Sequence, residues 1–135
     1  MVDSPTTAAS MLAARLGDRL QHDVSLAPMT TYRVGGRAAL FVEATSTDDL
    51  AAVAEAHLAT GVPVLVVGRG SNMLVSDGGF DGVAISIAGL GGDVTIPEPL
   101  PEPGAACTVA AGGGASLPVV ARRTAAAGLT GFEWA

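Results

Sequence analysis

The sequence of 135 residues predicts an α+β fold with a βαβ unit and a mixed sheet. An apolar strand pattern over residues 39–44 is followed by a helical pattern and by an apolar run over residues 64–67. Such a crossover joins parallel strands and is right-handed. Further apolar runs over residues 83–87 and 106–111 predict strands that a proline-rich loop at residues 97–104 separates.

Two further helices flank this unit. Residues 8–20 carry leucines four residues apart, although Gly17 costs about 1 kcal/mol relative to alanine inside a helix. Residues 21–37 contain proline and a glycine pair, so they predict an irregular lead-in. The last helix is expected to start near Ser116 and to end before Gly128.

The helix between the first two strands is the best marked. Ser46 or Thr47 can cap it, and Asp48 and Asp49 lie where the helix dipole favours acids. Gly61 can end it. Its predicted apolar face consists of Leu50, Val53, Ala54 and Leu58.

Composition excludes several classes of function. The chain is 49% hydrophobic, but no apolar run reaches the roughly 20 residues of a membrane span. The chain has seven basic side chains, all of them arginines, and thirteen acidic ones. The arginines are scattered along the sequence and form no basic stripe that could bind nucleic acid. His22, His57 and Cys107 lack the spacing of metal ligands, so no metal site is predicted. A cytoplasmic location is expected, since Cys107 has no disulfide partner.

A glycine-rich turn directly after residues 64–67 is the strongest candidate for a binding site. It consists of Gly68, Arg69, Gly70, Ser71 and Asn72. Glycine lets a ligand approach the backbone, and such a turn presents N–H groups to a phosphate. The turn leads on to another strand and not directly into a helix, so neither the Rossmann nor the Walker A motif fits.

Four blocks of sequence place this turn in a wider context. They are Thr30-Thr31-Tyr32-Arg33-Val34-Gly35-Gly36, Phe41-Val42-Glu43-Ala44, Val64-Leu65-Val66-Val67-Gly68-Arg69-Gly70-Ser71-Asn72-Met73-Leu74-Val75 and Ala127-Gly128-Leu129-Thr130-Gly131-Phe132-Glu133-Trp134. Together they resemble the amino-terminal part of the UDP-N-acetylenolpyruvoylglucosamine reductase family. Less specifically, they resemble the FAD-binding domains of the p-cresol methylhydroxylase and vanillyl-alcohol oxidase type.

The resemblance implies a flavoenzyme. In this family NADPH reduces non-covalently bound FAD, which then reduces UDP-N-acetylglucosamine enolpyruvate to UDP-N-acetylmuramate for peptidoglycan synthesis. Residues 1–24 would form an amino-terminal helix and lead-in, and residues 25–135 an incomplete FAD-binding domain. The family's catalytic residues are expected beyond Ala135, so this chain alone should be inactive. The expected cofactor-binding residues are Gly68, Arg69, Gly70, Ser71, Asn72, Met73, Gly112 and Gly113.

Several alternatives stay open. Gly112 and Gly113 could approach the flavin or simply form a loop, and Arg69 could contact a phosphate or only water. Replacing Gly70 by valine is expected to abolish flavin retention with little effect on secondary structure. The function could instead be an FAD-dependent oxidase or dehydrogenase acting on an alcohol or hydroxy acid, or a non-catalytic nucleotide-binding module.

Overall fold

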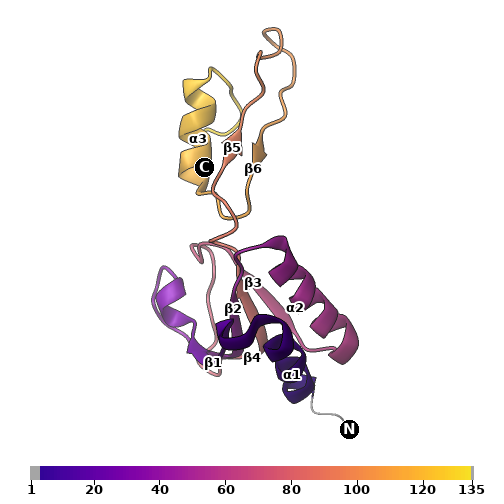
Figure 1. Cartoon of the computed structure of the whole chain (residues 1–135). Coiled ribbons are helices and arrows are strands. Elements are labelled where there is room, and N and C mark those ends of the chain that lie inside the picture. Colours follow the sequence, from indigo (N-terminus) through magenta and orange to yellow (C-terminus); the bar gives the residue numbers. More distant parts are fainter. Residues whose placement is uncertain (1–3, 135) are drawn as a thin grey trace.

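The computed structural model describes residues 4–134. Helices and strands alternate over the first half of the chain, and several strands then follow one another before the last helix (Figure 1). In order, the elements are α1 (Ser4–Leu16), the 3-10 helix η1 (Gly17–Arg19), β1 (Leu20–Ser25), the 3-10 helix η2 (Ala27–Met29), β2 (Arg37–Glu43), α2 (Thr47–Thr60), β3 (Val64–Val67), β4 (Phe80–Ser86), β5 (Val94–Thr95), β6 (Ala110–Ala111) and α3 (Leu117–Ala126).

Four strands form a mixed sheet in the order β1-β2-β4-β3. β1 runs antiparallel to β2, whereas β2 and β3 each run parallel to β4. The predicted βαβ unit is therefore present, with β4 inserted between its two strands. Because parallel strands end at the same edge of a sheet, the last residues of β2, β4 and β3 lie in one row, with Glu43 and Val67 each opposite Ser86.

Helices α1 and α2 cover one face of this sheet. The core beneath them includes Leu12, Val42, Val62, Val83 and Ile85, all buried. The buried side chains of α2 itself are Asp49, Ala52, Val53 and Ala56. The buried face of α2 is therefore rotated relative to the apolar face that the sequence predicts. Leu58, which is predicted to lie on that face, is 83% exposed.

The ends of α2 form as the sequence predicts. Ser46 accepts a hydrogen bond from the backbone N–H of Asp49 at 3.4 Å, and the Asp49 carboxylate accepts one from the N–H of Ser46 at 3.2 Å. This reciprocal pair is a capping box. Gly61 ends the helix in the left-handed region, where φ is 71°.

A bidentate ion pair joins η1 to the start of α2. Arg19 donates to both carboxylate oxygens of Asp49, at 2.7 and 2.9 Å. The Thr45 N–H donates to the same carboxylate at 2.8 Å. These hydrogen bonds, that from Arg19 above all, hold the pKa of Asp49 well below the usual range of an aspartate.

Loops and the short helix η2 cover the opposite face of the sheet. The buried cluster there consists of Leu26, Ala38, Phe41, Val67, Val75 and Ala84. Leu26 belongs to the connection between β1 and β2, and Val75 to the connection between β3 and β4. The segment that follows β3 is thus packed down onto the sheet on this side.

The last third of the chain forms a small separate layer. β5 and β6 pair antiparallel, with Val94 opposite Ala111, and α3 lies beside this hairpin at some distance from the large sheet (Figure 1). The proline-rich residues 97–104 lie in the long connection between β5 and β6. They separate two strands, as the sequence predicts.

Several element boundaries differ from the sequence-based expectation. The first helix ends at Leu16, because Gly17 adopts a φ of 56°. Residues 21–25, expected to be irregular, belong to β1, which starts at Leu20. The strand expected over residues 106–111 is only Ala110–Ala111.

Candidate functional site

The glycine turn, residues 68–72, leaves β3 at the edge where β2, β3 and β4 all end. This is the position at which open α/β sheets bind ligands. Arg69, Ser71 and Asn72 are exposed, whereas Gly70 is buried. Met73, also predicted to bind the cofactor, is partly buried and packs against the cluster beneath the turn.

The backbone donors of this turn are available to a ligand. Within residues 4–134, the N–H groups of residues 69–72 donate no hydrogen bond to another protein atom. The first N–H after them to be engaged is that of Met73, which donates to the Gly70 oxygen at 3.3 Å. Consecutive unpaired N–H groups favour an anion such as a phosphate.

Gly70 is required by the protein itself. Its φ is 65°, and a Cβ at this position would overlap the carbonyl oxygen of Met29. Replacing Gly70 by valine would therefore disturb the packing of the turn on η2. The expectation that secondary structure stays largely intact in this variant remains a prediction, although tertiary contact and backbone conformation both demand glycine here.

Gly68 has no such internal requirement. Its φ lies outside the left-handed region, and the nearest atom to an added Cβ would be the Gly113 oxygen at 4.0 Å. Neither backbone conformation nor packing within the chain explains a glycine at this position. A glycine free of both requirements would allow close approach of a ligand to the backbone.

The glycine run, residues 112–114, lies beside this turn, although more than 40 residues separate them in sequence. The Arg69 Nε donates to the Gly114 oxygen at 3.2 Å. Gly112 and Gly114 pack tightly on Gly91 and Ala88, whereas an added Cβ on the exposed Gly113 would meet only the Ile87 side chain, at 3.0 Å. The two predicted glycine segments thus lie side by side in the folded chain.

A third segment supports the turn from below. The Thr31 hydroxyl donates to the Ser71 oxygen at 3.2 Å, and Met29 lies directly against Gly70. Tyr32, in the same block, is 74% exposed. No pattern in the sequence identifies Thr31 and Met29 individually. Thr31 belongs to the block Thr30–Gly36 that contributes to the family resemblance, and Met29 directly precedes that block.

A cavity of about 490 Å³ opens beside the turn. The size is typical of a ligand pocket. Polar groups at its rim include Glu43 and Ser86, the last residues of β2 and β4, which sequence analysis did not select as site residues. A correct prediction of where β2 and β4 end, and of their order in the sheet, would have placed both residues at this edge. The lining residues are Gln21, Val24, Met29, Phe41, Glu43, Val67, Gly68, Arg69, Ser86 and Ala88.

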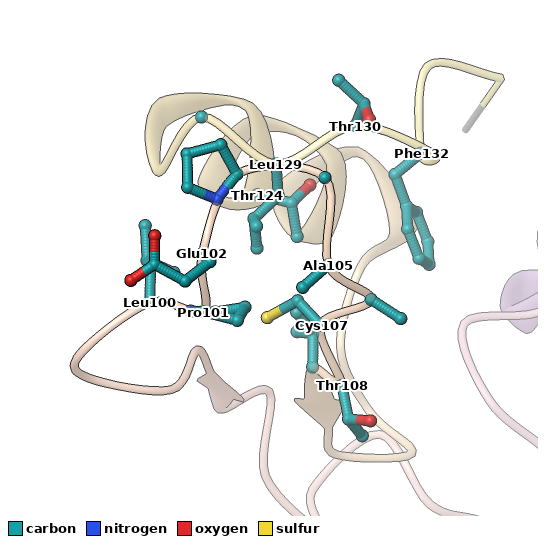
Figure 2. A pocket seen from close by; sticks show the side chains of 15 residues that line it. Leu100, Pro101, Glu102, Ala105, Cys107, Thr108, Thr124, Leu129, Thr130 and Phe132 are labelled. Atoms are coloured by element: carbon teal, nitrogen blue, oxygen red, sulfur yellow. The ribbon is translucent and has the colours of Figure 1, made fainter.

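A larger hollow of about 880 Å³ lies elsewhere, between the β5–β6 connection and the end of α3 (Figure 2). Pro101, Cys107, Thr124, Leu129 and Phe132 are among its lining residues. None of the predicted site residues lines it, and its walls are the β5–β6 connection and the segment that follows α3, with Thr124 the only lining residue from that helix. We therefore assign the candidate site to the glycine segments.

Other reactive side chains do not gather at this site. Within the described residues, no three His, Cys, Asp or Glu side chains form a group that could hold a metal ion. His57 Nδ1 lies 2.8 Å from the Val62 oxygen, which ties it to the end of α2. Among residues 4–134, no helix is long and apolar enough to span a bilayer. The catalytic residues expected beyond position 135 fall outside the described residues.

Comparison with known proteins identifies the domain. The family model described as "FAD binding domain" matches residues 38–135, which include all the predicted site residues. The chain is 39% identical over 116 residues to the UDP-N-acetylenolpyruvoylglucosamine reductase of Synechococcus sp. (strain WH7803), covering 86% of this chain and 35% of the relative. The enzyme of the same name from Paramagnetospirillum magneticum (strain ATCC 700264 / AMB-1) is 41% identical, over 89% of this chain and 36% of the relative. That from Nocardia farcinica (strain IFM 10152) is also 41% identical, over 90% of this chain and 29% of the relative.

The chain thus spans about a third of the length of the curated relatives it matches and resembles their amino-terminal part. The α+β architecture, the βαβ unit and the glycine turn agree with the family match. The chain belongs to the FAD binding domain family.

Proposed function

We propose that the glycine turn and Gly113 cradle the pyrophosphate of non-covalently bound FAD. The observation that carries this proposal is the row of N–H groups at residues 69–72 without acceptors in the described residues, beside a Gly68 whose lack of a side chain neither its φ nor any contact there requires. Bound through backbone donors, the pyrophosphate needs few cations, which is compatible with the net charge of −6. Ser71 and Asn72 add exposed polar side chains at the same turn.

We further propose that this domain serves an NADPH-dependent reductase that converts UDP-N-acetylglucosamine enolpyruvate to UDP-N-acetylmuramate, in the cytoplasm, for peptidoglycan synthesis. The names of the relatives support this assignment. FAD would supply hydride transfer from NADPH to the substrate. The described residues would bind and orient the cofactor, and the groups that act on the substrate would lie outside them.

The test uses the full-length protein that contains this chain. The purified protein is expected to show a flavin spectrum, to oxidise NADPH only with UDP-N-acetylglucosamine enolpyruvate present, and to form UDP-N-acetylmuramate. The 135-residue chain alone is expected to bind FAD weakly and to show no turnover. Turnover by this chain at a comparable rate would contradict the assignment of catalysis to other residues.

The same experiment separates the other classes of function. Reduction of the flavin by an alcohol or a hydroxy acid, with no reaction of the enolpyruvate, would indicate an oxidase or dehydrogenase. Colourless protein that binds plain nucleotides but not FAD would indicate a non-catalytic nucleotide-binding module. Either result would overturn the reductase assignment.

A further inference from the structure

We propose that Arg69 is a positioning residue that acts on the cofactor through the protein backbone, by holding the glycine run against the glycine turn. This inference rests on the proposed flavin site. Its basis is the hydrogen bond from Arg69 Nε to the Gly114 oxygen at 3.2 Å. An arginine beside a phosphate-binding turn is ordinarily expected to contact the phosphate itself.

The two segments that this hydrogen bond joins belong to different parts of the fold. The turn leaves β3 of the large sheet, whereas the run lies between β6 and α3 in the small layer. Within residues 4–134, no other hydrogen bond joins residues 68–72 to residues 112–114. The Arg69 side chain therefore sets the spacing between the two glycine segments on the side where the Gly113 oxygen faces Gly68.

The run is anchored on its other side by packing. The Gly112 N–H donates to the Asp93 oxygen at 2.9 Å, and Gly114 leaves no space for a Cβ beside Ala88. These contacts attach the run to the connection between β4 and β5, which is itself a loop. Losing the Arg69 contact would leave the run held only from this side, so the gap between Gly68 and Gly113 could widen.

The geometry of the arginine side chain suits this role. Its Nε–H is a directional donor held close to the chain, whereas the lysine ammonium is a mobile point charge that favours water. Lysine at position 69 should consequently replace the charge but not the contact.

The test compares Arg69→Met and Arg69→Lys with Arg122→Met, which alters an exposed arginine of α3, in the full-length protein. Both changes at position 69 are expected to raise the Kd for FAD about 3- to 10-fold, the loss typical of one net hydrogen bond. Both should also change the visible circular dichroism of the bound flavin, while the melting temperature of the flavin-free protein stays unchanged. Arg122→Met should change none of these.

Salt dependence separates positioning from direct phosphate contact. If Arg69 contacted the pyrophosphate, removing its charge would flatten the dependence of the Kd on salt, and lysine would rescue binding. Either outcome would overturn the proposal, as would an unchanged Kd and dichroism in Arg69→Met. Failure of the unaltered protein to bind FAD would instead reject the flavin site itself.

Discussion

Gly68→Ala is the substitution that best separates ligand binding from folding. The added Cβ would lie 4.0 Å from the nearest protein atom, the Gly113 oxygen, and the φ of Gly68 is one that alanine can adopt. The flavin-free protein should therefore unfold at the same temperature or slightly higher, because alanine restricts the unfolded chain. The bound cofactor, in contrast, would meet the new methyl group.

The expected loss of affinity follows from the number of hydrogen bonds disturbed. N–H···O bonds of about 2.9 Å weaken steeply when they are stretched beyond about 3.5 Å. A pyrophosphate displaced from the N–H groups of residues 69–72 would lose at least two such bonds. Each contributes about 1.5 kcal/mol to binding a charged group, so the loss is about 3 kcal/mol, or about 100-fold in Kd.

The assay is titration of flavin-free full-length protein with FAD, followed by flavin fluorescence. Gly78→Ala is the control, because Gly78 is also outside the left-handed region and is exposed, and an added Cβ there would meet only the Ser76 hydroxyl at 3.6 Å. The control should bind FAD normally. An unchanged Kd in Gly68→Ala would refute close approach of the cofactor to this glycine.

Three further predictions concern stability and cofactor attachment. Gly70→Ala should lower the free energy of unfolding by at least about 2 kcal/mol, because its Cβ would overlap Met29 at a φ of 65°; an unaltered melting temperature would contradict this. Asp49→Ala should lower the free energy of unfolding by about 2 to 3 kcal/mol, because α2 loses its cap and Arg19 loses its partner. In the same denaturant titration, Arg15→Ala, which removes an exposed ion pair, should lower it by less than about 0.5 kcal/mol. Folding lowers the pKa of Asp49, so its contribution to stability is present above the ordinary carboxyl pKa of about 4 and is lost as the pH falls below that value. Asp49→Ala should therefore show a shallower loss of stability in acid than the unaltered protein. Acid precipitation of the full-length protein should release the flavin, and colour retained in the pellet would indicate a covalent bond.

Local signals in the sequence predict the central part of the fold well. The cap at Ser46, the acids that follow it and Gly61 determine where α2 begins and ends, because each acts within a single turn of the chain. The apolar run before the glycine turn specifies β3 in the same way. The position of the turn at the carboxyl edge of the sheet follows from this order of elements.

The missed elements depend on partners that are distant in sequence. Residues 20–25 are mostly polar and form a strand because they pair with β2, and the buried face of the alanine-rich α2 is decided by what α1 and the sheet place against it. Alanine contributes little directional preference, so the more apolar Leu58 could be left exposed.

The candidate site likewise has features that the sequence predicts and features that only the folded chain shows. The sequence alone determines which residues can bind a phosphate, because glycine, serine and asparagine in a turn are a local chemical property. Tertiary structure decides what each residue does there. Only the packing against Met29 explains Gly70, only the absence of such packing singles out Gly68, and only the folded chain brings Arg69 to Gly114. These roles depend on distances across the fold, which no local pattern contains.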